Sequence, residues 1–294
     1  MGLRHVFEKD IARDSQVSGA RRRIFIACED YKTEVSYFNR LLEESERLGL
    51  YGRVEVILLN RYYPDRGVSD PMRVARMCHD HMLYLERGVC TKDMFAGVVL
   101  EEVGEENRVM VSDMLADEGF ACMVGDDGII SDIQAAQEFA VGYMSDRGFE
   151  ITVILPRKEY YPDTDEVYLV VDRDDRSERP PDKYLAFISY CREKGFVPVV
   201  TNPQFEFWML MHIEDVGDDL EAVRDSKNPA ATLKRRMKAR GMEKGHPDLD
   251  ALIPGLDVAM RRSERYLLSA EELVSRVGTR MPVLINALKD DEGR

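Results

Sequence analysis

The chain has 294 residues, of which 44% are hydrophobic and 9% aromatic, so it is long enough for one large domain or two modest ones around a buried core. A formal net charge of −14 argues against a protein that coats nucleic acid with its whole surface, because phosphate contacts require Lys and Arg, although a local nucleic-acid site stays compatible with it. No stretch approaches the roughly 18 to 20 uncharged apolar residues of a membrane-spanning helix, and acids interrupt the N-terminal segment, so we expect a cytoplasmic protein without membrane contact.

The cysteines do not form a disulfide or zinc-binding pattern. They are five in number, scattered along the chain and never spaced as CxxC, which argues against both kinds of site. We expect them to be reduced thiols in the core: Cys28, Cys78, Cys90, Cys122 and Cys191.

Strands and helices alternate in the first part of the chain. Residues 21–28 read as a buried strand, 33–49 as an amphipathic helix, 53–60 as a second strand and 70–87 as a second helix. Thr33 is the expected N-cap of the first helix. Asp70 caps the second, with Pro71 at its first helical position.

The pattern is less regular between residues 89 and 162. The run "MFAGVVLEEV" (94–103) fits either a strand or a helix, and "FACMVGDDGIIS" (120–131) reads as a strand and a turn. Residues 132–148 read as a helix and "FEITVILP" (149–156) as a strand. We therefore expect residues 89–162 to form an inserted subdomain.

The alternation resumes after the insertion and predicts a mixed α/β fold. Residues 166–172 and 196–201 read as strands, and 181–195 and 203–215 as helices. Such alternation indicates a mostly parallel sheet with helices on both faces. The expected organisation is a discontinuous core (20–88 and 163–215), the insertion (89–162) and a helical C-terminal region (216–294).

Acidic residues follow two of the predicted parallel strands. Glu29 ends the first strand, and Asp172 and Asp174 follow the third main strand. Each acid alone is also typical of a solvated turn, but the carboxyl ends of parallel strands meet at one edge of the sheet, where ligands bind. Carboxylates about 4 Å apart repel by around 4 kcal/mol per pair at an effective dielectric near 20. A hard divalent cation, Mg²⁺ or Mn²⁺, would relieve that repulsion and supply phosphoryl-transfer or phosphodiester chemistry.

Two further features are open to alternative interpretations. Glu206 lies in the apolar run "FEFWMLM" and needs a partner, such as the metal cluster, a basic side chain, a backbone cap or His212; a catalytic role and a structural ion pair are both compatible. The basic run "LKRRMKAR" (233–240), followed by Arg261, Arg262 and Arg265, is either a solvated helix face or a patch that binds phosphates.

Three sequence blocks resemble the RloB-like family, whose catalytic core is similar to the Toprim fold of primases, topoisomerases and overcoming-lysogenization-defect nucleases. They are "CEDYKTEVSYF" (28–38), "VVDRDD" (170–175) and "NPQFEFWMLMH" (202–212), with a weaker match at "VGTRMPVLINAL" (277–288). Asp30 departs from the pattern, because the family usually has glycine after the glutamate. The resemblance implies a Toprim-like sheet for the core.

The resemblance also implies roles for individual residues. Glu29 would act as general base or acid close to a metal ion that Asp172 and Asp174 hold, and Glu34 and Glu206 match motif positions in the catalytic set. Lys32 would contact phosphate, and we add Arg173, Lys234, Arg235 and Arg236 as candidate substrate-binding residues. Tyr37, Phe205 and Trp208, at helical spacing, are expected in the core rather than as base-stacking platforms.

The resulting functional expectation is a Mg²⁺- or Mn²⁺-dependent nuclease. A topoisomerase requires a strand-cleaving tyrosine in a separate large domain and a primase requires template-binding modules, and we expect neither to fit within 294 residues. Similar family members are abortive-infection (AbiL-type) and antiphage defence components encoded beside an ABC- or AAA-type ATPase, so we expect an effector, as a monomer or homodimer, that cleaves RNA or DNA, with tRNA as a candidate substrate. The alternative is a non-catalytic partner or scaffold subunit. A nucleotide phosphotransferase is less well supported, since neither GxxxxGK[ST] nor GxGxxG occurs.

Overall fold

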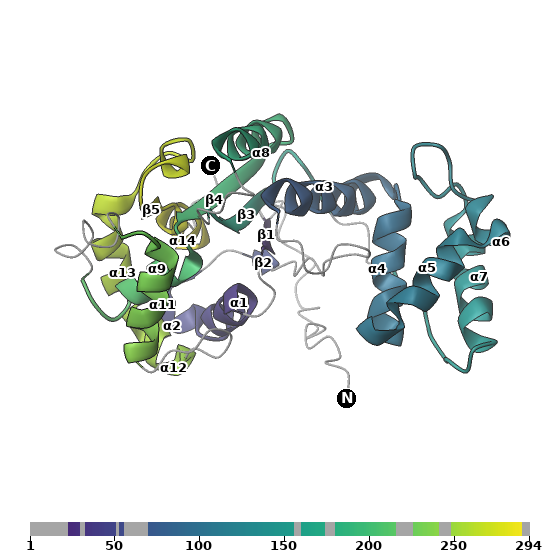
Figure 1. Cartoon of the computed structure of the whole chain (residues 1–294), viewed down its shortest axis with the longest axis horizontal. Coiled ribbons are helices and arrows are strands. Elements are labelled where there is room, and N and C mark those ends of the chain that lie inside the picture. Colours follow the sequence, from purple (N-terminus) through teal and green to yellow (C-terminus); the bar gives the residue numbers. More distant parts are fainter. Residues whose placement is uncertain are drawn as a thin grey trace, which may run out of the picture.

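The computed structural model describes residues 23–29, 33–50, 53–55, 70–155, 160–173, 180–215, 226–240 and 248–289. Within these residues the chain forms a five-stranded sheet in the order β2-β1-β3-β4-β5 (Figure 1). Four strands are parallel, and β5 runs antiparallel to β4. The strands are β1 (Arg23–Cys28), β2 (Arg53–Glu55), β3 (Glu166–Asp172), β4 (Phe196–Asn202) and β5 (Gly278–Thr279).

The helices surround this sheet and extend beyond it (Figure 1). None of the described helices is both long and apolar enough to cross a membrane. The helices before β3 are α1 (Thr33–Glu43), α2 (Ser45–Leu48), α3 (Pro71–Arg87), α4 (Lys92–Val103), η1 (Glu105–Asn107), α5 (Arg108–Ala116), α6 (Glu118–Ala121) and α7 (Ile133–Ser145). Those after β3 are α8 (Pro181–Glu193), α9 (Phe205–Met211), α11 (Pro229–Ala239), α12 (Leu249–Leu252), η2 (Ile253–Gly255), α13 (Leu256–Ser263), η3 (Glu264–Tyr266), η4 (Glu272–Val274) and α14 (Met281–Lys289).

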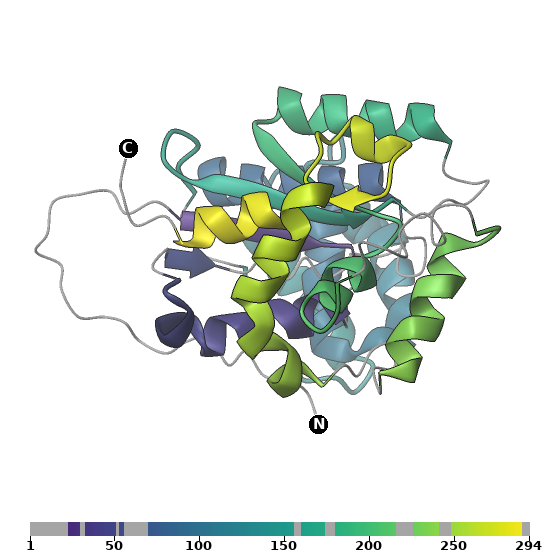
Figure 2. The same ribbon diagram turned by 90° about the vertical axis from the view of Figure 1, so that its left-hand side faces the viewer.

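The central strands are apolar on both faces because helices cover both faces. Phe25 of β1 and Leu169 of β3 pack with α3 and α8, whereas Ile26 and Val170 pack with α1, α9 and α14. Figure 2 shows the helices above and below the sheet. The prediction of a mixed α/β protein with a mostly parallel sheet and helices on both faces is therefore confirmed.

The strand and helix predictions outside the insertion are largely confirmed. The structure has β1, β3, β4, α3 and α8 within a few residues of the predicted bounds, and the C-terminal region is mostly helical. The sequence analysis missed β5, a two-residue strand whose Thr279 hydroxyl lies 2.8 Å from the Thr201 hydroxyl. The predicted strand residues 56–60 lie outside the described part of the chain.

Two helix ends differ from the predictions. Thr33 is itself the first residue of α1, and its hydroxyl makes no hydrogen bond among the described residues, so the predicted Thr33 cap is wrong. Helix α9 ends at Met211, four residues before the predicted end at 215.

The insertion is more helical than predicted. The ambiguous run 94–103 lies in α4. Residues 120–131 form the end of α6 and a turn, with two isolated bridges (Val124 to Ile130 and Thr91 to Ile129) rather than a strand. Residues 149–155 are not a strand: Val153 is buried, but its carbonyl accepts from the side-chain amide of Gln137 on α7 at 2.8 Å, not from a neighbouring strand. The apolar core of this segment is continuous with that of α3, so its separation as a subdomain stays a prediction.

Four of the five cysteines are free thiols in the core, as predicted: Cys28, Cys78, Cys90 and Cys191. Cys122 is exposed, so the prediction of a core position is wrong for this residue. It lies just beyond the short helix α6, where the chain turns at the surface.

The predicted cap of α3 gives the first test. The Asp70 carboxylate accepts from the Met72 backbone nitrogen at 3.1 Å, and Pro71 occupies the first helical position. Replacing Asp70 with Ala should lower the free energy of unfolding by about 1 kcal/mol, because an N–H of the first turn loses its acceptor. Urea denaturation of Asp70→Ala and Asp70→Asn measures this loss. The asparagine variant keeps an acceptor and should stay close to wild type; equal destabilisation of both would contradict the assignment.

Candidate functional site

The candidate site lies where β1 and β3 end side by side. The chain leaves β1 into α1, on the Ile26 face of the sheet, and leaves β3 toward α8, on the opposite face. From β1 the chain proceeds to β2 on one side of the sheet, and from β3 it proceeds to β4 on the other side, so the order in which the strands are added reverses between β1 and β3. In open α/β sheets such a switch point leaves a crevice at the carboxyl ends of the strands, where ligands bind.

The side chain of Glu29 adds one more hydrogen bond to the parallel pairing of β1 with β3. Its backbone nitrogen donates to the Val170 carbonyl at 3.0 Å, and its Oε2 accepts from the Asp172 backbone nitrogen at 2.9 Å. The carboxylate thus takes the place that a backbone carbonyl has in a regular parallel ladder. Only 3% of Glu29 is exposed. The structure confirms that Glu29 and Asp172 meet at one edge of the sheet.

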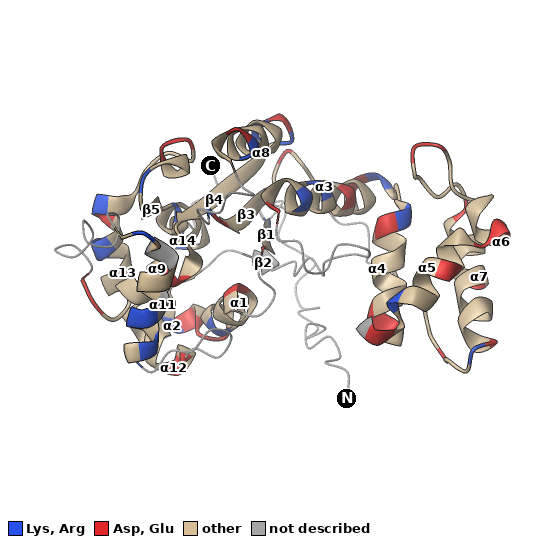
Figure 3. Cartoon of the chain, viewed as in Figure 1, with Lys and Arg blue, Asp and Glu red and all other residues tan. Residues whose placement is uncertain are grey.

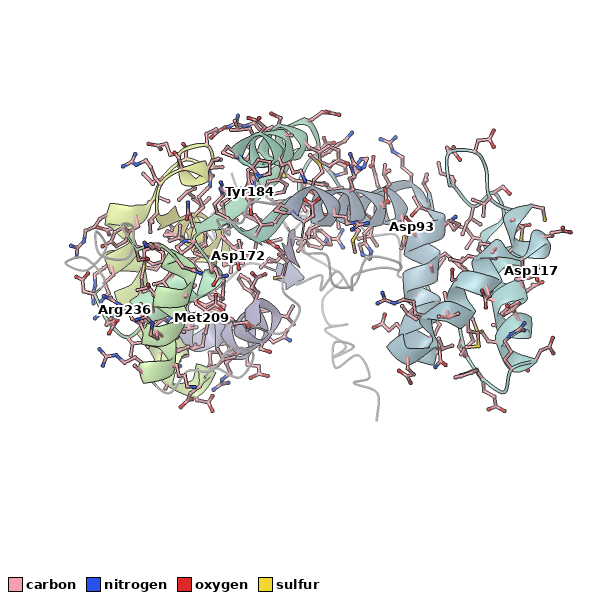
Figure 4. All side chains as sticks on the ribbon, viewed as in Figure 1. Asp93, Asp117, Asp172, Tyr184, Met209 and Arg236 are labelled. Atoms are coloured by element: carbon pink, nitrogen blue, oxygen red, sulfur yellow. The ribbon has the colours of Figure 1, made fainter. Side chains whose placement is uncertain are left out.

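Asp172 connects three elements at this edge. Its Oδ1 accepts from the backbone nitrogen of Phe205, the first residue of α9, at 2.7 Å. Its backbone carbonyl accepts from the Tyr184 hydroxyl of α8. Figure 4 shows Asp172 between Tyr184 and the α9 residue Met209. A carboxylate has about four lone-pair positions, so it can bind more than one group at the same time.

Two more buried acids begin helices next to this edge. Glu34 lies in the first turn of α1, which follows β1, and Glu206 in the first turn of α9, which follows β4. Both are buried, with 1% and 7% exposed, and a helix N-terminus stabilises a negative charge. Among the described residues Glu206 has no hydrogen bond or ion pair, and its carboxylate oxygens are not among the fully buried unpaired atoms, so they keep some contact with solvent.

The described acids do not by themselves form a complete cation cage. Among the residues that the structure covers, no group of three or more His, Cys, Asp or Glu side chains has the arrangement of a metal site. Asp174, the third expected ligand, and Lys32 lie outside the described residues. The predicted metal set of Glu29, Asp172 and Asp174 therefore stays a prediction, with two of its members now placed together.

Arg173 is buried and anchors the end of β3. Its Nε donates to the Val274 carbonyl at 2.8 Å, and its guanidinium carbon lies 4.7 Å from the centre of the Tyr184 ring. Its backbone nitrogen donates to Thr201 in β4. With 4% exposed, Arg173 has limited access to a substrate, and its predicted substrate role stays untested.

Helix α11, which contains the basic residues Lys234, Arg235 and Arg236, packs next to α9 (Figure 3). Arg235 is exposed, and Arg236 pairs with Glu214 at 3.8 Å. The side chain of Lys234 is outside what the structure describes. Their predicted role in substrate binding stays a prediction.

A polar network joins the first and third sequence blocks. Trp208 Nε1 donates to the Tyr37 hydroxyl at 2.9 Å, the Tyr37 hydroxyl lies 3.2 Å from His212 Nε2, and His212 Nδ1 lies 2.9 Å from the Leu252 carbonyl. Because a carbonyl can only accept, Nδ1 carries the proton and Tyr37 donates to Nε2. The pKa of His212 falls to about 4 through burial, so the ring is neutral. His212 is thus a structural link, and the predicted core positions of Tyr37, Phe205 and Trp208 are confirmed.

Sequence reasoning missed two hydrogen-bond partners that are distant along the chain: the Tyr184 hydroxyl, which binds the Asp172 carbonyl, and the Val274 carbonyl, which binds Arg173. Tyr184 lies on the buried face of α8, and no motif distinguished it from other core aromatics. The Val274 carbonyl is a backbone group 101 residues from Arg173, so no side-chain pattern could have indicated it.

A family model for RloB-like proteins matches residues 24–288, and the chain therefore belongs to the RloB-like family. No curated protein and no solved structure matched the chain. The matched range includes Glu29, Asp172 and the Tyr37, Trp208 and His212 network.

The network predicts a stability effect. Tyr37→Phe removes one hydroxyl that serves both Trp208 Nε1 and His212 Nε2 and leaves both buried groups without their partner. We expect the free energy of unfolding to fall by about 1–3 kcal/mol, measured by chemical denaturation. The matched control is Tyr161→Phe, because Tyr161 is 62% exposed and should change stability by less than about 0.5 kcal/mol. Equal effects of the two substitutions would contradict the network.

The low pKa of His212 predicts a pH dependence. The unfolded histidine has a pKa of about 6.5 and the folded one about 4, so between these values the unfolded chain binds the additional proton. The free energy of unfolding should therefore decrease as the pH falls, by at most about 1.4 kcal/mol per pH unit for this residue.

His212→Asn tests this contribution because asparagine keeps a donor near the position of Nδ1 and does not titrate. Its unfolding free energy should depend less on pH than that of the wild type between pH 6.5 and 4. Burial also lowers the pKa of His81 to about 4, so His81→Asn should likewise reduce the pH dependence of the unfolding free energy. An unchanged slope in His212→Asn would contradict the assignment of a neutral buried ring.

Proposed function

We propose that this chain is a Toprim-like, metal-dependent nuclease that cleaves phosphodiester bonds in RNA or DNA. The observation that carries the proposal is the meeting of Glu29 and Asp172 at the β1/β3 switch point, with Glu29 Oε2 2.9 Å from the Asp172 nitrogen. This is where open α/β sheets bind ligands, and two adjacent acids there favour a ligand that contains a cation.

The residues at the edge fit a hard divalent cation. All the candidate donors are carboxylates, the ligand type that Mg²⁺ and Mn²⁺ prefer, and Mg²⁺ is commonly held by one or two carboxylates together with water and phosphate. Glu206 is compatible with the fit, because it is a largely buried carboxylate that has no partner among the described residues and keeps some contact with solvent. Glu29 and Asp172 would hold the ion, with Asp174 as a further ligand. When bound, such an ion stabilises negative charge on a phosphodiester oxygen.

The protein groups would have distinct tasks in this proposal. Glu29, held by the Asp172 N–H, would accept or donate a proton at the scissile phosphodiester as general base or acid. Glu34 and Glu206 would complete the negative surroundings of the ion. Lys32, Lys234, Arg235 and Arg236 would contact the backbone of the nucleic acid, because phosphate contacts supply most of the affinity for such substrates.

The biological role that we propose is based on family membership. As an RloB-like protein, the chain would be the effector of a bacterial antiphage or abortive-infection system in the cytoplasm, restrained or delivered by an ABC- or AAA-type ATPase. A tRNA substrate is proposed by analogy with other Toprim-like defence effectors.

One observation favours a second candidate function, a non-catalytic partner subunit of such a complex. Both central acids already have structural hydrogen bonds: Glu29 extends the β1–β3 pairing, and Asp172 accepts from the first backbone nitrogen of α9. If these two hydrogen bonds are the only role of Glu29 and Asp172, the protein would bind neither a metal ion nor a substrate at this edge.

Amide substitutions separate the two functions. In Glu29→Gln and Asp172→Asn an oxygen remains to accept from the Asp172 and Phe205 nitrogens, while the negative charge is lost. Labelled tRNA, single-stranded DNA and plasmid are incubated with each protein, with Mn²⁺ or EDTA, with and without the neighbouring ATPase. Both variants should lose about 100-fold or more of the cleavage rate but unfold at the same denaturant concentration as the wild type. EDTA should abolish cleavage by the wild type.

Isothermal titration with Mn²⁺ provides a second readout. The wild type should bind the ion, and Asp172→Asn should bind it more weakly. Absence of cleavage by the wild type on all substrates, even with the ATPase, would contradict the nuclease. Full activity of both amide variants in a complex with the ATPase would support the scaffold instead.

A further inference from the structure

The charge of the chain is unevenly distributed between its two ends. The segment from α4 to residue 155, which we call the acidic arm (residues 92–155), contains 14 of the 55 acidic residues but only 3 of the 41 basic ones. It lies at one end of the molecule, and α11 and α13 lie at the other (Figures 1 and 3). Figure 4 labels Asp117 in the arm and Arg236 at the opposite end.

Twelve of the 14 acids of the arm are not neutralised within the described part of the chain. These twelve are exposed and none of them forms an ion pair there: Glu101, Glu102, Glu106, Asp113, Asp117, Glu118, Asp126, Asp127, Asp132, Glu138, Asp146 and Glu150. The arm also projects from the sheet, because α5, α6 and α7 pack mainly on one another and on α4. Such a concentration of exposed like charge repels itself and attracts a basic surface.

The opposite end presents a surface of the complementary charge, which we call the basic face. It consists of the exposed residues Arg235 and Lys238 on α11 and Arg261 on α13, with Arg240 and Arg265 beside them. Glu214 pairs with Arg240, and Asp215 pairs with Arg265 at 2.6 Å, so these two arginines are partly neutralised. Arg261 interacts with Asp257, one turn earlier on α13, so Arg235 and Lys238 contribute most of the positive charge of the face.

Both surfaces also expose large apolar side chains. On the arm, Val109 is 72% and Ile154 73% exposed. Next to the basic face, Ile213 is 41% exposed, immediately before Glu214, and Leu267 is 44% exposed, two residues after Arg265. Protein interfaces combine apolar contact with charges that fix register and partner.

We propose that the acidic arm docks on the basic face of a second copy of this chain. Because the two surfaces lie at opposite ends, an antiparallel two-fold arrangement makes the same contact twice, with each arm on the other copy's basic face. The occupant is a second copy because charge and exposed apolar residues match between the two ends of the same chain. This inference does not depend on the proposed nuclease function.

Salt dependence is the first test, carried out on the full chain by sedimentation velocity. Screening shortens the Debye length from about 10 Å at 0.1 M salt to about 3 Å at 1 M, so the dimer should form in low salt and dissociate in high salt. A wild type that stays monomeric at 0.05 M salt and about 100 μM protein would overturn the proposal.

Charge reversal is the second test, with two complementary variants. The arm variant carries Glu101→Lys, Glu102→Lys, Asp113→Lys and Glu118→Lys; the face variant carries Arg235→Glu, Lys238→Glu and Arg261→Glu. Each variant alone should dimerise about 100-fold more weakly than the wild type, because like charges then meet. The matched control, Asp163→Lys with Asp182→Lys, reverses exposed acids outside both surfaces and should leave the dimer unchanged.

Mixing the two variants distinguishes docking from misfolding. In the mixture the reversed arm meets the reversed face and the native arm meets the native face, so a heterodimer of near wild-type affinity should form. Failure of the mixture to associate, or association of either variant at the wild-type level, would overturn the proposal. A face variant that loses binding to labelled tRNA but dimerises normally would also overturn it and assign the basic face to nucleic acid.

Discussion

The hydrogen bond from the Asp172 backbone nitrogen to the Glu29 carboxylate determines the geometry of the candidate site. It is possible only because β1 and β3 are neighbours in register, with Cys28 opposite Val170, so that the next side chain of β1 reaches the next backbone nitrogen of β3. Through this bond the buried Glu29 carboxylate lies at the switch point. The Asp172 carboxylate beside it accepts from the first backbone nitrogen of α9. Arg173, the next residue along the chain, is buried and bonded to the Thr201 and Val274 carbonyls, so the end of β3 is held from both sides.

Most of the aromatic and histidine residues in the family blocks stabilise the fold rather than contact a substrate. Tyr37 and His212 are 175 residues apart, yet they belong to one hydrogen-bonded network with Trp208 and the Leu252 carbonyl. The network fixes α1 against α9, the two helices whose first turns contain Glu34 and Glu206. A histidine that is neutral, buried and bonded at both nitrogens is poorly suited to proton transfer, so we assign His212 a structural role.

The parts of the fold that the sequence predicted well have strong local signals. Buried parallel strands read as continuous apolar runs, which indicated β1, β3 and β4, and Asp70 with Pro71 marked the start of α3. The same reasoning placed Glu29 beside Asp172. It left residues 94–103 undecided between strand and helix and was wrong at 149–155, because a short apolar run has the same appearance in a buried helix, a strand or a packed loop. The anchoring of Arg173 by the Val274 carbonyl was beyond sequence reasoning, since it depends on a backbone group distant along the chain.

Asp172 has a further consequence for how the molecule responds to ligands. Its side chain holds the start of α9, its carbonyl holds Tyr184 of α8, and its nitrogen holds Glu29. Under the proposed function, a cation at this carboxylate would compete with the Phe205 nitrogen for its electron density, so binding of the cation and the position of α9 would be thermodynamically linked. By reciprocity, a partner that shifts α9 would then change the affinity for that cation without contacting either acid.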